Sequence, residues 1–152
     1  MAVRRYLVVA NQTLGGEPLV WRIRDLARRG ACEFRLVVPA TPPRDHVWTE
    51  GEARATARVR LDAALARFAG LGVKAQGEVG DGNPMLAIQD VLRDHGPFDE
   101  IILSTLPRSL SKWLKVDLPH RAEAAFGLPV THVVGEPEVG TSSRHARRRR
   151  VS

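Results

Sequence analysis

The sequence has only one cysteine and no long apolar run, and each of these features excludes a class of protein. Cys32 is the one cysteine among 152 residues, so no intramolecular disulfide can form. Such cysteine usage favours a cytoplasmic location. No apolar run approaches the ~18–20 residues that span a bilayer, so we expect no membrane insertion. The apolar run at residues 6–10 is shorter than the ~7–15-residue core of a secretory signal and favours a β-strand.

Excess positive charge is nearly absent from most of the chain, although the formal net charge is +6. Residues 141–152 hold five arginines and no acid, which leaves 18 basic and 17 acidic side chains in the other 140 residues. The last residues also lack the apolar side chains needed for packing. We therefore expect an α/β domain over residues 1–138 and a disordered arginine-rich tail over 139–152. The tail lacks interleaved aromatics, so a nucleic-acid partner is the less favoured interpretation, and tail-mediated binding to nucleic acid stays an alternative.

Short β-rich runs alternate along the chain with longer runs of helical periodicity, a pattern typical of repeated βαβ units. The pattern predicts a single doubly wound α/β domain, with a five-stranded parallel sheet and helices on both faces. The expected strands cover residues 6–10, 33–38, 73–79, 99–103 and 129–134, and the expected helices cover residues 17–29, 49–69, 85–94 and 119–126.

The segment 99–134 is the most informative part of the sequence. It combines a buried strand, a loop of about a dozen residues, a helix and a second apolar strand. Together with Val79-Gly80-Asp81-Gly82-Asn83-Pro84 and Pro129-Val130, this layout resembles the universal stress protein family over residues 3–135. The resemblance implies the strand order 3-2-1-4-5. It also implies a homodimer formed through the last strand, with Val130, His132 and Val134 at or near the seam.

In many members of that family the loop carries the motif G-x2-G-x9-G-[S/T], whose backbone wraps the phosphates of ATP. Here the same spacing falls on Ser104, Pro107, Asp117 and Leu118. Pro107 lacks an N–H donor, and Asp117 stands before a helix where a capping carboxylate would repel phosphate. We therefore interpret Asp117 as a structural cap. ATP or another adenine nucleotide is a disfavoured ligand, and no cofactor is assigned.

Ligands of open α/β sheets bind outside the carboxyl ends of the strands, at the point where the strand order reverses. Asn11 follows the first strand, where nucleotide-binding members of the family have an aspartate; it either contacts a ligand or, as we favour, shapes the turn. The loop could clasp an anion through Lys112 and stack a base on Trp113, or Trp113 and Leu114 could pack on the sheet. The candidate ligand-binding residues are Ala10, Asn11, Gln12, Thr13, Pro39, Ala40, Gly80, Asp81, Gly82, Asn83, Ser104, Thr105, Pro107, Arg108, Ser111, Lys112 and Asp117.

Catalytic motifs are not found in the sequence. Ser104, His120, His132 and Asp117 suggest a hydrolase triad, but the G-x-S-x-G elbow is missing, as are H-E-x-x-H and the Walker pattern. We therefore expect no metal site and assign no catalytic residue. The favoured function is binding or regulation in a stress response, without turnover and without the usual phosphate loop. The alternative is a nucleotide-binding protein or weak ATPase with a variant pocket.

Overall fold

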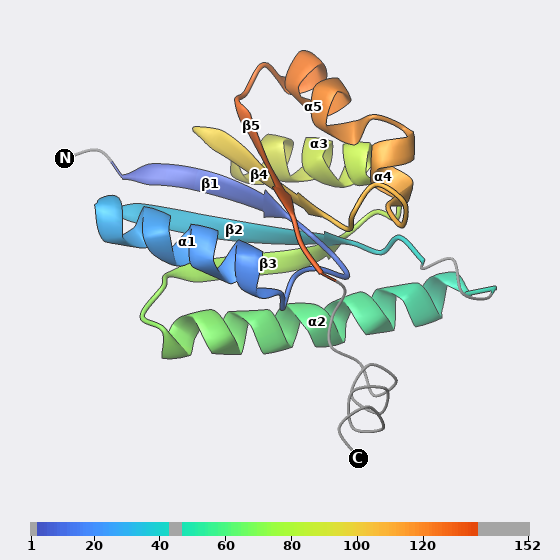
Figure 1. The fold of residues 1–152 in the computed structure, drawn as a ribbon, viewed down its shortest axis with the longest axis horizontal. Helices are drawn as coiled ribbons and strands as arrows, with labels where there is room; N and C mark the ends of the chain where they lie inside the picture. Colours follow the sequence, from blue (N-terminus) through green and yellow to red (C-terminus); the bar gives the residue numbers. More distant parts are fainter. Residues whose placement is uncertain (1–2, 43–46, 137–152) are drawn as a thin grey trace.

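The computed structural model describes residues 3–42 and 47–136, which form one α/β layer structure (Figure 1). Five parallel strands form a single sheet in the order β3-β2-β1-β4-β5, which confirms the predicted fold class and strand order. The predicted tail at 139–152 lies outside the described residues. The strands are β1 (Arg4–Val9), β2 (Cys32–Pro39), β3 (Ala75–Gly80), β4 (Glu100–Thr105) and β5 (Val130–Val134). The helices are α1 (Glu17–Arg29), α2 (Glu50–Gly70), α3 (Pro84–His95), α4 (Lys112–Lys115) and α5 (Leu118–Phe126).

The helices divide between the two faces of the sheet, as predicted. α1 and α2 cover one face, and α3, α4 and α5 cover the other (Figure 1). Alternate residues of the central strands therefore enter two separate hydrophobic clusters. Val8 packs toward α1 and α2, whereas Leu7 and Val9 pack toward α3 and α5. Because the side chains of β1 are buried on both faces of the sheet, its sequence is a nearly continuous apolar run.

A local signal in the sequence marks the start of the longest helix, α2. Thr49 and Glu52 form a capping box at the start of α2, in which each side chain accepts a hydrogen bond from the other residue's backbone N–H. Ala53, Ala57 and Leu61 lie at helical spacing and are buried against the sheet. The helix runs one residue past its predicted end, to Gly70. None of the helices in the described ranges is long and apolar enough to cross a membrane.

The segment after β4 differs from the prediction of an irregular loop. β4 continues to Thr105, two residues past its expected end, and the short helix α4 lies within the loop. Ser111 caps the start of α4: its hydroxyl accepts a hydrogen bond from the Leu114 N–H at 3.1 Å. The loop is therefore a folded unit that brings Trp113 onto the core of the α3 and α5 face, where its side chain is 8% exposed.

Cys32 begins β2 and is partly buried against the cluster under α1 and α2. Burial raises the pKa of its thiol, so this cysteine stays protonated and unreactive at neutral pH. The structure agrees with the interpretation of Cys32 as a packed residue.

A cavity between the ends of β1 and β4

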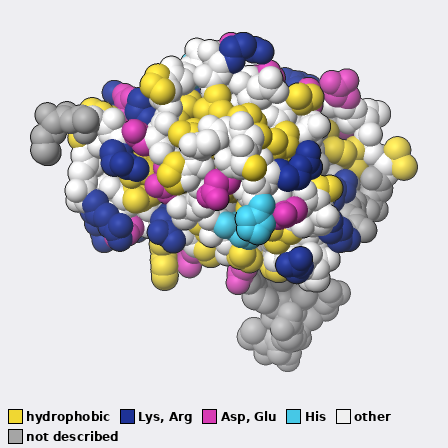
Figure 2. Space-filling view, turned by 90° about the horizontal axis from the view of Figure 1, so that it is seen from above, with side chains coloured by type: hydrophobic (Ala, Val, Ile, Leu, Met, Phe, Trp, Pro, Cys, Tyr) yellow, Lys and Arg dark blue, Asp and Glu magenta, His cyan; other side chains and the backbone are white. Residues whose placement is uncertain are grey.

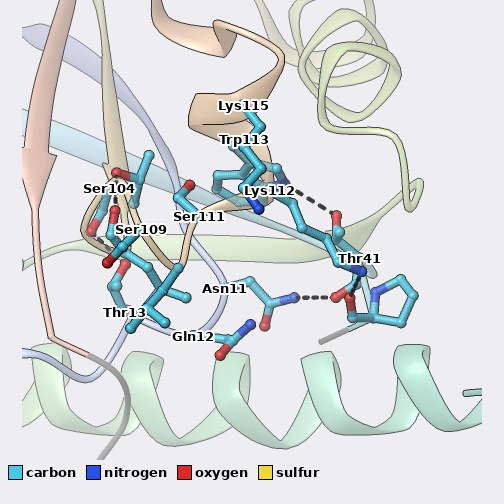
Figure 3. A pocket seen from close by; sticks show the side chains of 14 residues that line it. Asn11, Gln12, Thr13, Thr41, Ser104, Ser109, Ser111, Lys112, Trp113 and Lys115 are labelled. Carbon is cyan, nitrogen blue, oxygen red and sulfur yellow. Dashed lines mark hydrogen bonds between the residues drawn. The ribbon is translucent and has the colours of Figure 1, made fainter. Parts of the chain in front are cut away.

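A cavity of about 460 Å³ opens at the carboxyl ends of β1 and β4, where the strand order reverses (Figure 3). Its volume lies in the ~300–1,000 Å³ range of small-molecule sites. The loops after β1, β2 and β4 supply its walls. The lining residues are Asn11, Gln12, Thr13, Thr41, Pro42, Ser104, Thr105, Leu106, Ser109, Leu110, Ser111, Lys112, Trp113 and Lys115.

Seven of the predicted ligand-binding residues line this cavity, and the others do not. The seven are Asn11, Gln12, Thr13, Ser104, Thr105, Ser111 and Lys112. Ala10 and Ala40 are buried in the core, and Pro39, Pro107, Arg108 and Asp117 also lie outside the lining. Ser109, Trp113 and Lys115 belong to the loop that the sequence singled out. The apolar lining by Pro42, Leu106 and Leu110 was not predicted.

The turn after β3 lies outside the lining as well, and its residues have structural roles. A Cβ on Gly80 would come within 2.8 Å of the Ala87 Cβ, so glycine lets α3 pack closely on the sheet. The Asp81 carboxylate accepts a hydrogen bond from the Asn83 N–H, and the Gly82 carbonyl accepts one from the Thr41 hydroxyl. Asn83 caps α3 by accepting from the Met85 N–H. The turn supports the wall that carries Thr41.

Asn11 shapes the turn after β1, where its backbone carbonyl accepts a hydrogen bond from the Leu14 N–H at 3.1 Å, and its side chain has further partners beyond that turn. Its side chain is almost buried, and its amide nitrogen donates to the carbonyl oxygens of Pro39 at 2.8 Å and Thr41 at 3.2 Å. Its amide oxygen accepts a hydrogen bond from the Arg60 guanidinium at 2.7 Å. Asn11 therefore ties the loop after β1 to the loop after β2 and to α2. An aspartate could not donate the first two bonds.

The buried hydroxyls of the cavity are paired with protein groups. The Thr13 and Ser104 hydroxyl oxygens lie 2.5 Å apart, and both side chains are almost fully buried. The Thr105 hydroxyl lies 2.8 Å from the His132 Nε2 and 2.9 Å from the Leu106 carbonyl oxygen. In the described part of the chain no buried side-chain nitrogen or oxygen lacks a hydrogen bond. A ligand would therefore use the more exposed groups of the wall.

Several backbone N–H groups of the loop after β4 are also engaged inside the loop. Carbonyl or hydroxyl oxygens of residues 107–114 accept the hydrogen bonds of five loop amides, those of Leu110, Ser111, Leu114, Val116 and Asp117. A phosphate-wrapping loop needs such amides free and aimed at the ligand. The loop thus lacks the glycines of a phosphate loop, and five of its amides already have acceptors within the loop.

Asp117 precedes α5 but does not cap it with its side chain, which corrects the structural-cap interpretation. Its backbone is left-handed, with a φ of 53°, and its carboxylate accepts no backbone N–H of the helix. One carboxylate oxygen instead lies 2.9 Å from the His120 Nδ1, and both side chains are exposed. Because Asp117 lies outside the cavity lining, its charge does not occupy the cavity.

Asp117→Gly is expected to leave the free energy of unfolding unchanged or slightly higher, whereas Asp117→Ala is expected to lower it by about 1 kcal/mol. The physical reason is the left-handed backbone, which glycine adopts without the steric cost that alanine incurs. Urea denaturation of the three proteins measures the difference. A glycine variant less stable than the alanine variant would contradict the left-handed backbone at this position. A glycine variant clearly less stable than the wild type would indicate that the carboxylate stabilises the helix start.

Two lysines give the cavity a positive charge that no acidic side chain of residues 3–42 and 47–136 is seen to pair with. The Lys112 ammonium donates to the Pro42 carbonyl oxygen at 2.6 Å, a neutral partner. Lys115 is exposed and makes no ion pair with the described residues. Among the described residues, none that lines the cavity is acidic. Figure 3 shows these lysines and Trp113 entering from α4, opposite Asn11 and Gln12.

The histidine, serine and aspartate side chains that could perform acid–base or metal chemistry are not brought together in the described structure. His132 lies beside Thr105 at the sheet edge, where burial lowers its pKa and favours the neutral ring at pH 7. His120 pairs with Asp117 away from the lining, and Ser104 pairs with Thr13. No three histidine, cysteine, aspartate or glutamate side chains within residues 3–42 and 47–136 are placed to hold a metal ion.

Neither a scan of protein-family models nor a search of curated proteins finds a match to this chain.

Proposed function

We propose that this chain is a cytoplasmic binding or regulatory protein of the stress response, similar to universal stress proteins, that holds a small ligand without turning it over. The strand order 3-2-1-4-5 and a cavity at the reversal point of that order support the proposal. Open α/β sheets bind their ligands at this position. The lone thiol of Cys32, protonated and partly buried, is compatible with a cytoplasmic protein.

The observation that carries the proposal is the composition of the cavity wall. Two lysines, unpaired with any acid of the wall, stand beside Trp113 and leucine side chains, while the buried hydroxyls are already paired. Such a wall is suited to hold a ligand, and its described residues offer no activated nucleophile and no general base in contact with one. Binding without turnover follows from these two features.

A nucleotide-binding protein or weak ATPase is the second candidate. The volume of the cavity and the presence of Lys112, Lys115 and Trp113 favour it, because lysines pair with phosphates and an indole can stack on a base. The engaged amides of the loop count against it.

Calorimetric titration with ATP, ADP, AMP and cyclic nucleotides, with magnesium present, separates the two candidates. We expect no micromolar binding of ATP, because the loop has no glycine that lets its backbone approach the phosphates closely, and five of its amides already have acceptors. Micromolar binding that disappears in Lys112→Met would favour the nucleotide-binding candidate. The matched control is Lys74→Met, since Lys74 lies outside the cavity lining and pairs with Glu33.

We extend the proposal to a homodimer formed through the edge strand β5. Among the described strands this one pairs with β4 alone, and Val134 is 51% exposed on it beside the exposed His132. An open edge of this kind can pair with a second copy. Sedimentation velocity is expected to give twice the monomer mass, and Val134→Lys is expected to return it to the monomer value. A monomer at all concentrations would contradict the dimer.

Nucleic acid is not part of the proposal. Figure 2 shows the face that carries α5, where acidic and basic side chains are mixed and no charge of one sign dominates. The first 140 residues together carry a net charge of only +1. A phosphate backbone is bound by a surface rich in positive charge.

A further inference from the structure

Among the described residues that line the cavity, the positively charged side chains come from one side of it. Lys112 and Lys115 are three residues apart in α4, so their side chains leave the same side of this short helix. Lys115 has no acidic partner among the described residues, and Lys112 contacts only the neutral Pro42 carbonyl there. The opposite wall offers the neutral amides of Asn11 and Gln12 (Figure 3). The cavity can therefore neutralise an anionic group at one end of a ligand.

Apolar side chains make up the wall next to this charge. Trp113, Leu106, Leu110 and Pro42 all line the cavity. Leu110 is 53% exposed there, a large apolar side chain that remains in contact with solvent. Covering it with the apolar part of a ligand would remove that surface from water, which is favourable in proportion to its area. The ligand should thus have an apolar body as well as an anionic group.

The polar groups left for a ligand are few. Asn11 and the hydroxyls of Thr13, Ser104 and Thr105 are engaged by protein partners. Among the described residues, Gln12 and Ser109 make no side-chain hydrogen bond. Two lysines, one amide and one hydroxyl match a single acidic group. A chain of phosphates would need more donors, and five loop amides already have acceptors within the loop.

We infer that the cavity binds a small organic acid, with its carboxylate against Lys112 and Lys115 and its apolar body against Trp113, Leu106 and Leu110. The inference rests on the proposed function, because it names the ligand class of the same cavity. It departs from nucleotide binding in requiring one anionic group and a continuous apolar body. No bond is made or broken in this binding.

Equilibrium dialysis of the full chain against naphthoate tests this ligand class. Naphthamide has the same body without the charge, acetate has the charge without the body, and inorganic phosphate and ATP represent the phosphate alternative. Lys115→Met and the double variant Lys112→Met with Lys115→Met remove the charge. Lys74→Met is the matched control, because it changes the third lysine of the chain, which is 72% exposed outside this cavity.

We expect naphthoate to bind at least about tenfold more tightly than naphthamide, and acetate and phosphate to bind more weakly than either, because a charge-assisted hydrogen bond contributes roughly that factor. The double variant should lose the preference for naphthoate over naphthamide, while Lys74→Met should keep it. Equal affinity for naphthoate and naphthamide, or an unchanged preference in the double variant, would overturn the inference.

The other outcomes separate this inference from the proposed function. If ATP, phosphate or naphthamide binds and naphthoate does not, the organic acid is wrong while the cavity remains a ligand site. If none of the five probes binds the wild-type chain, both the ligand class and the binding function are overturned.

Discussion

Trp113→Ala is expected to lower the free energy of unfolding by about 3–5 kcal/mol, the range measured for removing a large aromatic side chain from a core. Trp113 is 8% exposed and packs in the cluster under α3 and α5. Its indole N–H also points at the Thr41 hydroxyl, 3.4 Å away, across the cavity. Truncation would therefore open a void beneath α4 and release the loop that forms one wall.

Urea denaturation measures this loss, and the chain offers a matched control. Trp21 lies on α1 with 65% of its surface exposed, so Trp21→Ala should change stability by less than about 1 kcal/mol. Trp113→Phe should recover much of the loss, since it restores most of the buried apolar volume. Equal losses for Trp113→Ala and Trp21→Ala would show that α4 is not packed on the core.

Asn11→Asp is expected to lower the free energy of unfolding by about 1–3 kcal/mol at pH 7, the cost of leaving buried polar groups unpaired. The carboxylate would face the carbonyl oxygens of Pro39 and Thr41, which now accept hydrogen bonds from the amide, and it has no proton to donate. The Arg60 guanidinium would offset part of this repulsion, because it already donates to the Asn11 side chain.

Asn83→Asp is the control for this substitution. Asn83 caps α3 through its side-chain oxygen, and aspartate caps a helix as well as asparagine does. We expect the control to change stability by less than about 0.5 kcal/mol. If Asn11→Asp proved as stable as the wild type, the Asn11 side chain would not hold the two loops together. The asparagine would then be open to a ligand, as in the interpretation that we did not favour.

Hydrophobic periodicity was sufficient to predict the elements of the sheet, because each central strand is buried on both faces and each long helix on one. The strand order came from the resemblance, since periodicity alone does not order parallel strands. α4 was missed because four residues, Lys112–Lys115, are too short to show a helical period. The structure, by contrast, reveals Ser111 as its cap.

The features of the site that the sequence did not reveal depend on long-range contacts and on backbone conformation. Asn11 bonds to residues 28 and 30 positions away, which local turn preferences cannot reveal. Asp117 stands before Pro119 like an N-cap, but its left-handed backbone turns the carboxylate toward His120. The turn at residues 80–83 was included because parallel strands end at one edge. β2 separates β3 from β1, however, so this turn lies beyond the gap between β1 and β4.

Amide NMR during a titration with ATP and magnesium tests the central claim most directly, namely that this cavity is a ligand site without a phosphate loop. The account predicts that the amide signals of Leu110, Ser111 and Leu114 stay in place, because their N–H groups bond within the loop. It also predicts that naphthoate shifts signals of residues 11–13 and 104–115. Large shifts of the three loop amides at micromolar ATP would contradict the account, since they would show these N–H groups turning to phosphate.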